Sequence, residues 1–244
     1  MHEITLICPD DWHCHLRDEE YLERTVADEA LRFKRAIVMP NLSPPITTVT
    51  AATDYLKRIK KNIPQHSEFT PLLTLYLTDT TTPAMIQAAQ QSTIIKACKL
   101  YPAGATFHSA QGVCDIKRLY PVFEAMQETE LLLLIHGEVV AAQVDIFERE
   151  AVFVERLLQP LLKDFPTLRI VLEHVSSKTG VDFVTAGPAN LAATITPHHL
   201  LLNRNDLLTN GVHPHYYCLP VVKHAADQNA LIQRFLQTFG YDVQ

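Results

Sequence analysis

Two histidines, His13 and His15, end the first apolar stretch of the chain, and Arg17 follows two residues later. Residues two apart in a β-strand point to the same face, so a strand that ends here offers two imidazoles side by side. Paired imidazoles suit a divalent metal such as zinc, and a guanidinium suits a carboxylate that it binds through two hydrogen bonds. The spacing predicts hydrolytic chemistry at a metal, with two ordinary histidines in a turn as the alternative reading.

Polar side chains also follow several other apolar runs that read as strands. They are Asn41, Lys99, His136 and His174, with the pair His198 and His199 after the last run. Functional side chains of barrel folds gather at the C-terminal ends of the strands, so we expect these residues to form one site. His198 and His199 have either substrate-side or purely structural roles. Glu138 either orients a neighbouring ligand or lies on a surface loop.

Lys99 ends an apolar strand, where a lysine usually extends its ammonium group to the surface. Beside two metal ions and partly desolvated, the amine would instead favour its neutral form, which can capture carbon dioxide as a carbamate. The two carbamate oxygens can bridge two metal ions, and four histidines around that bridge would complete a binuclear centre. Such a centre lowers the pKa of a bound water, so that hydroxide is available near neutral pH.

Apolar runs and amphipathic segments alternate along the chain. The runs that read as strands are 4–7 or 12–15, 36–39, 71–77, 97–100, 131–135, 170–172 and 191–195. The segments that read as helices are 19–33, 48–62, 83–91, 116–128, 148–165, 178–185 and 224–239. Runs such as 131–135 are apolar without alternation, which is typical of parallel strands buried on both faces. The sequence therefore predicts an α/β fold in one domain, residues 1–244.

The count of strand–helix units falls one short of a (β/α)8 barrel. Seven units can be read, and the long connection over residues 196–223 takes the length that an eighth would need. About 250 residues is a typical length for such a barrel. We therefore expect a TIM-type barrel without its eighth strand and C-terminal region.

Composition excludes several classes of function. The chain has 244 residues and a net charge of −6, so no broad basic surface for nucleic acid is expected. No apolar run approaches the roughly 20 residues that span a bilayer, and the first residues do not resemble a secretory signal. Five scattered cysteines favour free thiols in a reducing cytoplasm. The chain thus reads as a cytoplasmic protein that binds neither nucleic acid nor membrane.

Short strings around the candidate residues resemble one known family. They are residues 11–18 (DWHCHLRD), 39–42 (MPNL), 99–106 (KLYPAGAT), 136–138 (HGE), 173–174 (EH), 196–199 (TPHH) and 217–220 (YCLP). In order and spacing they resemble the class II dihydroorotases of the amidohydrolase superfamily, over nearly the whole chain. The His-x-His string is shared by the superfamily, whereas Asn41 and the strings at 99–106 and 217–220 are specific to this family.

The resemblance implies a zinc-dependent, reversible cyclisation of N-carbamoyl-L-aspartate to dihydroorotate in pyrimidine biosynthesis. It implies two zinc ions per chain, a small-molecule substrate and a homodimer. One zinc would be bound by His13 and His15, the other by His136 and His174, with carboxylated Lys99 bridging them. The remaining implied roles belong to substrate binding: Arg17 and Asn41 would hold the substrate carboxylate, and the backbone at Leu219 would contact the ring.

One part of the family pattern has no counterpart in these residues. Family members carry a Gly-Thr-Asp-Ser-Ala-Pro-His-type motif at the end of strand eight, whose aspartate binds the first zinc and acts as general base and acid. No such motif occurs in the sequence, and Asp242 does not stand in that context. We therefore assign no catalytic residue and expect the first zinc position to be incomplete. The alternative function is a truncated, catalytically impaired dihydroorotase-like fragment that binds metal or a partner.

Overall fold

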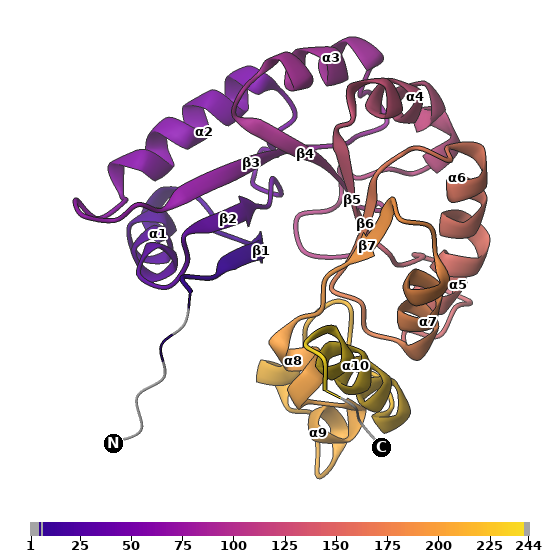
Figure 1. Ribbon diagram of the computed structural model, residues 1–244. Coiled ribbons are helices and arrows are strands. Elements are labelled where there is room, and N and C mark those ends of the chain that lie inside the picture. Colours follow the sequence, from indigo (N-terminus) through magenta and orange to yellow (C-terminus); the bar gives the residue numbers. More distant parts are fainter. Residues whose placement is uncertain (1–4, 6, 242–244) are drawn as a thin grey trace.

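Seven parallel strands form one sheet, and their order in the sheet is their order in the chain. The computed structural model describes residue 5 and residues 7–241. The strands are β1 (Asp10–Cys14), β2 (Arg35–Val38), β3 (Thr70–Tyr76), β4 (Ile95–Leu100), β5 (Leu132–His136), β6 (Ile170–Glu173) and β7 (Leu191–Ala193). Figure 1 shows the sheet curled into an open barrel whose edges are β1 and β7. The predicted α/β fold, a barrel of this type short of one strand, is confirmed for the described residues.

Helices cover the outer face of the curled sheet (Figure 1). They are η1 (Glu19–Tyr21), α1 (Leu22–Ala30), α2 (Val49–Lys61), α3 (Pro83–Gln91), η2 (Ile116–Leu119), α4 (Tyr120–Thr129), α5 (Arg149–Phe153), the π-helical η3 (Val154–Leu158), α6 (Gln159–Asp164) and α7 (Lys178–Ala186). Caps help to set where they begin: the Thr48 side chain accepts a hydrogen bond from the Ala51 N–H at the start of α2.

The strand period of two separates an outer and an inner core. Ala36, Val38, Leu133 and Ile135 belong to the large cluster that packs against the helices. The residues that alternate with them, including Ile37 and Leu134, form a small cluster inside the curve of the sheet. Side chains two residues after an inner position point to the same inner face. Lys99 follows Ala97 by two and His136 follows Leu134 by two, so both are directed inward at the ends of their strands.

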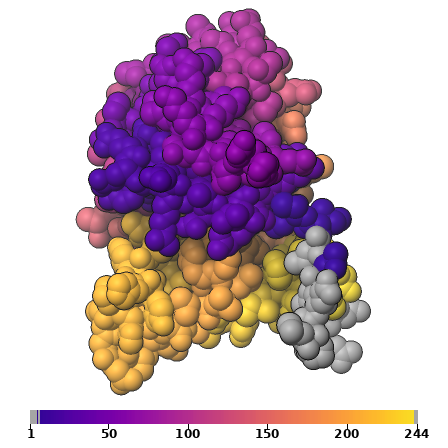
Figure 2. Space-filling model, turned by 90° about the vertical axis from the view of Figure 1, so that its left-hand side faces the viewer, coloured from indigo at the N-terminus to yellow at the C-terminus, as the bar shows by residue number. Residues whose placement is uncertain are grey.

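The chain beyond β7 is more regular than the sequence indicated. The connection 196–223 contains α8 (Pro197–Leu201), α9 (Arg204–Leu208) and η4 (Pro214–Tyr216), followed by α10 (Ala225–Thr238). Proline at the start of α8 and an Asn203 cap before α9 explain these short helices, which are too brief to show a periodic pattern. Figure 2 shows this part of the chain, in orange and yellow, as the lower portion of one face, below the indigo-to-magenta part of the barrel.

Two other predicted elements differ from the structure. The first strand ends at Cys14, so His15 lies just beyond it. Of the alternative strand 4–7, residues 4 and 6 lie outside the described residues, and residues 5 and 7 are in no strand. The helix expected at 148–165 is interrupted by the π-helical turn η3. No helix among the described residues is long and apolar enough to cross a membrane.

Candidate active site

Four histidines from the C-terminal ends of three strands, β1, β5 and β6, lie next to one another. The Nε2 atoms of His13 and His15 are 3.1 Å apart. The ring centroid of His174 lies 5.1 Å from that of His13 and 4.7 Å from that of His136. The structure thus brings together the imidazoles that the sequence placed at separate strand ends.

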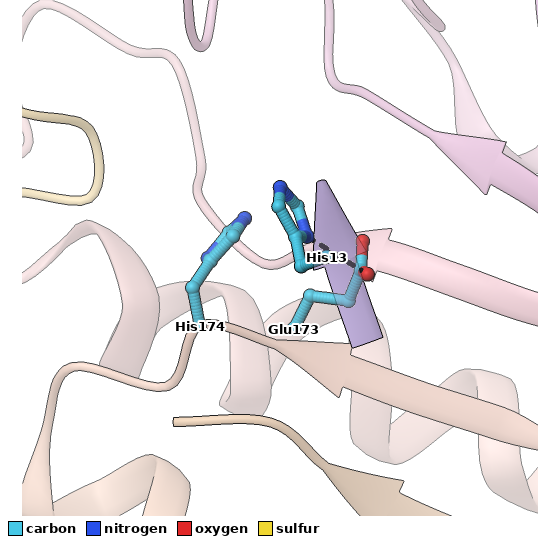
Figure 3. Close-up of side chains that lie close together, drawn as sticks. All are labelled: His13, Glu173 and His174. Carbon is cyan, nitrogen blue, oxygen red and sulfur yellow. Dashed lines mark hydrogen bonds and ion pairs between the residues drawn. The ribbon is translucent and has the colours of Figure 1, made fainter. Parts of the chain in front are cut away.

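A buried carboxylate, Glu173, connects this cluster to Lys99. Glu173 ends β6 and points inward, and its Oε1 lies 2.9 Å from Nδ1 of His13 (Figure 3). Its Oε2 forms an ion pair with Nζ of Lys99, and both side chains are fully buried. Burial by itself would raise the pKa of Glu173, but the charges of Lys99 and His13 lower it to about 2. Sequence reasoning gave Glu173 no role, although a carboxylate between the apolar run 170–172 and His174 was the available signal.

A second carboxylate, Glu138, contacts His136. Its Oε2 lies 2.8 Å from Nε2 of His136, and both side chains are buried. Of the two predicted alternatives for Glu138, the surface-loop position is therefore wrong. A carboxylate only accepts hydrogen bonds, so Nε2 of His136 and Nδ1 of His13 carry the protons. Nδ1 of His136 then keeps a free lone pair, and the lone pair on Nε2 of His13 faces Nε2 of His15 at 3.1 Å.

The histidines have the chemical form that a metal requires. Burial lowers the pKa of His15 and of His174 well below the ordinary value, and it also lowers the pKa of His136. These imidazoles are therefore neutral near pH 7, which is the metal-binding form.

The spacing also fits a metal. Two nitrogen ligands of a tetrahedral zinc, with bonds of roughly 2.0–2.1 Å, lie about 3.3 Å apart, close to the 3.1 Å between His13 and His15. His13, Glu173 and His174 each offer one ligand atom within 4.8 Å of the others. Nδ1 of His174 is buried and has no hydrogen-bond partner among the described residues. This donor set is one that a borderline-soft cation such as zinc prefers.

Arg17 and Asn41 line a neighbouring cavity of about 400 Å³ with Phe107 and His108. Nη1 of Arg17 and Oδ1 of Asn41 are buried without a hydrogen-bond partner in the part of the chain that the structure describes. Nδ2 of Asn41 donates to the Phe107 carbonyl at 3.1 Å. An unsatisfied buried guanidinium nitrogen is costly, so this cavity is suited to an anion.

A separate cavity of about 290 Å³ contains the histidine cluster. Its lining includes His13, His15, His136, His174, His198, Thr106, Leu219 and Pro220. The predicted ring contact, Leu219, therefore lies beside the histidines and not beside Arg17. Thr106 lines this cavity while the next two residues line the Arg17 cavity, so the segment 106–108 forms part of the wall of both. A larger cavity of about 440 Å³ touches Glu138 but is otherwise mostly apolar and contains none of the histidines.

His199 holds the segment that carries Leu219. Its Nε2 donates to the Pro220 carbonyl at 3.0 Å, and its Nδ1 accepts from the Thr196 hydroxyl at 2.6 Å. These bonds favour the structural reading of His199, whereas His198 lines the histidine cavity. Burial lowers the pKa of His199 to about 3.

This lowered pKa predicts a pH-dependent stability. Between pH 6.5 and about 3 the unfolded chain protonates His199 while the folded chain does not, so stability falls as the pH falls. We expect His199 alone to contribute about 1.4 kcal/mol per pH unit to that slope in the metal-free chain. Urea unfolding at pH 6.0 and 5.0 measures the slope, and the matched variant His199→Gln should reduce it by that amount. An unchanged slope in the variant would contradict the assignment of a neutral, buried His199.

The chain is similar to several known proteins. No protein-family model matches the chain. A dihydroorotase of Coxiella burnetii is 64% identical over 233 residues, which is 96% of this chain and 67% of that protein. The chain belongs to the dihydroorotase family. A second member, from Teredinibacter turnerae, is 53% identical and matches 94% of this chain and 66% of its own length. The chain thus spans about two thirds of the length of these curated dihydroorotases.

Solved dihydroorotases share the fold. The enzyme of Campylobacter jejuni has a TM-score of 0.87 at 37% identity, with 96% of this chain and 66% of that chain covered. The dihydroorotase of Saccharomyces cerevisiae, in complex with 5-fluoroorotic acid, has a TM-score of 0.84 at 34% identity, with 94% and 66% covered. An L-hydantoinase of Arthrobacter aurescens matches at 18% identity with a TM-score of 0.72, which indicates a common barrel fold.

Proposed function

We propose that the chain carries the metal and substrate site of a dihydroorotase, which interconverts N-carbamoyl-L-aspartate and dihydroorotate. The observation that carries this proposal is the placement of four clustered histidines and a buried lysine beside a cavity with an unsatisfied guanidinium. The first group suits a metal and the second suits a carboxylate, and dihydroorotate presents a cyclic amide together with a carboxylate. Membership of the dihydroorotase family supports this pairing.

Two zinc positions are proposed. His13 and His15 would hold one ion, His136 and His174 the other, and Lys99 would bridge them as a carbamate. When bound, the metal would polarise the amide carbonyl and lower the pKa of the attacking water. Burial lowers the pKa of Lys99, although the charge of Glu173 acts in the opposite direction. The lowered pKa favours the neutral amine that carboxylation requires. Glu173 and Glu138 fix the ring orientation of His13 and His136 through their hydrogen bonds.

Arg17 and Asn41 would bind the substrate carboxylate, and the backbone at Leu219 would contact the ring. The amide of Asn41 now bonds to the Phe107 carbonyl, so a bound carboxylate would compete with that loop contact. The yeast relative was solved with 5-fluoroorotic acid, also an acid on a pyrimidine ring. We further propose a homodimer in the cytoplasm, where the five free cysteines would stay reduced.

A metal-binding chain of low activity is the second candidate function. The family's strand-eight aspartate motif has no counterpart among these 244 residues. A polypeptide of this sequence would then bind zinc and substrate with little turnover. The two candidates share the same site and differ only in the rate of the chemical step.

Substrate binding tests the proposal without depending on turnover. We expect the zinc-loaded chain to bind dihydroorotate at least tenfold more tightly than dihydrouracil, which has the same ring without the carboxylate. Isothermal titration calorimetry measures both affinities. Arg17→Met should remove the preference for dihydroorotate, whereas the surface variant Arg24→Met should retain it. Equal affinity for both rings in the parent chain would favour a hydantoinase-type substrate.

Zinc should be retained asymmetrically. One position has all of its expected ligands, which are Lys99, His136 and His174. The other has His13, His15 and the shared lysine but lacks the aspartate that the family supplies there. After extensive dialysis we expect one tightly held zinc per chain, measured by elemental analysis. His174→Ala should lose this ion and His15→Ala should keep it. Two ions retained equally would show that another residue completes the first position.

A further inference from the structure

A second buried polar cluster surrounds the carboxylate of Glu150 in α5 and includes the loop that follows His174. Ser176 donates to Glu150 Oε2 from its backbone N–H at 2.9 Å and from its hydroxyl at 2.7 Å. Ser177 donates to Oε1 from its N–H at 2.9 Å and from its hydroxyl at 2.5 Å. Glu150, Ser176 and Ser177 are all buried. Four hydrogen bonds to one carboxylate tie the loop after β6 to α5.

Lys223 connects a third segment to this cluster. Its buried ammonium donates to the Ser176 hydroxyl at 2.6 Å. The strand-end residue His174 lies two positions before Ser176, and Leu219 lies four positions before Lys223. The cluster therefore joins two segments that both line the histidine cavity.

His174 itself has an unusual backbone. Its φ is 43°, in the left-handed region that residues other than glycine rarely adopt. Such strain persists only where surrounding contacts determine the conformation. Thr194 provides one restraint: its hydroxyl accepts from the His174 N–H at 2.8 Å, and its carbonyl accepts from the Val175 N–H at 2.9 Å. Glu150 provides the second restraint, because it accepts hydrogen bonds from Ser176 and Ser177, which follow Val175.

We propose that Glu150 is a positioning residue: its carboxylate fixes the loop after β6 so that the strained backbone of His174 directs the imidazole at the metal position. The inference rests on the proposed role of His174 as a ligand. Among the described residues Glu150 forms no hydrogen bond with a proposed ligand, so its effect passes through Ser176 and Ser177. Gly180 permits the arrangement, because a Cβ there would lie 2.6 Å from Oε1 of Glu150.

Two variants perturb the carboxylate in different ways. Glu150→Gln removes its charge and half of its acceptor capacity. Gly180→Ala leaves Glu150 intact but displaces it, although alanine is otherwise a better helix former than glycine. Thr48→Ala is the control, because it removes a helix cap far from the site and affects only folding.

The test measures zinc affinity by chelator competition, the visible spectrum of the cobalt-substituted chain, and the melting temperature of each metal-free variant. We expect both variants to weaken zinc binding about 10–100-fold and to shift the cobalt bands. Thr48→Ala should lower the melting temperature with zinc affinity unchanged.

The outcomes separate the inference from the proposed function. If His174→Ala loses zinc while Glu150→Gln and Gly180→Ala bind it as tightly as the parent chain, the positioning role is overturned and the proposed site stands. If the parent chain binds no zinc, or His174→Ala binds it unchanged, both are overturned. Should Glu150→Gln fail to fold, Glu150→Asp decides in its place, because Gly180→Ala also brings a Cβ within 2.8 Å of Cγ1 of Val175, next to His174.

Discussion

Replacing Lys99 by methionine should lower the free energy of unfolding of the metal-free chain by about 3–5 kcal/mol. The ion pair between Lys99 and Glu173 is fully buried, and methionine fills a similar volume without the charge. The loss comes from Glu173, whose carboxylate would remain buried with only His13 as a partner. Urea unfolding in the presence of a chelator measures the change.

Two matched variants control this measurement. The ion pair between Lys178 and Asp182 is exposed, so Lys178→Met should change stability by less than about 1 kcal/mol. The double variant Lys99→Met with Glu173→Gln should recover part of the loss, because it removes the unpaired charge. A loss below 1 kcal/mol for Lys99→Met alone would mean that Glu173 is protonated or solvated when Lys99 is absent.

Turnover of dihydroorotate by a polypeptide of these 244 residues should be about 10²–10⁴-fold slower than that of an extended chain. The extended chain fuses these 244 residues to the remaining third of the Coxiella burnetii relative, which the match does not cover. The physical reason is the general base, which the family places in the strand-eight motif and which this sequence does not contain. Both proteins are assayed with zinc and bicarbonate at saturating substrate.

An aspartate-to-asparagine change in the strand-eight motif of the extended chain is the control. It should return the rate to that of the 244-residue polypeptide if the motif supplies only the base. A turnover above about 1 per second for the unextended polypeptide would show that one of its own residues replaces the aspartate.

Much of the fold followed from local pattern. Apolar runs such as that before His136 have the length and composition of buried parallel strands, and the strand period then directs Lys99 and His136 inward. The candidate ligands could be proposed because each directly follows such a run. The sequence pattern did not predict the short helices after β7, whose ends depend on proline and capping residues and not on apolar periodicity.

The supporting carboxylates could not be predicted in the same way. Glu173 and His13 are 160 residues apart, and Glu150 and Ser176 are 26 apart. Such contacts depend on how strands and loops are juxtaposed, which no local spacing encodes. Glu138 was ambiguous for a related reason: a carboxylate two residues after a strand lies either inside or outside the barrel, according to a turn that the sequence does not determine.

The order of the strands has a consequence for biosynthesis. Each strand pairs with the one made just before it, so the growing chain can extend the sheet one unit at a time as it leaves the ribosome. The contact between His13 and Glu173 is different, because 160 residues separate its two halves. At about 5–20 residues per second, roughly 8–30 s of translation pass between the two. The sheet can therefore form progressively, whereas the histidine cluster closes only once β6 has been synthesised. A metal ion held by the proposed ligands would then be loaded late in the maturation of the chain.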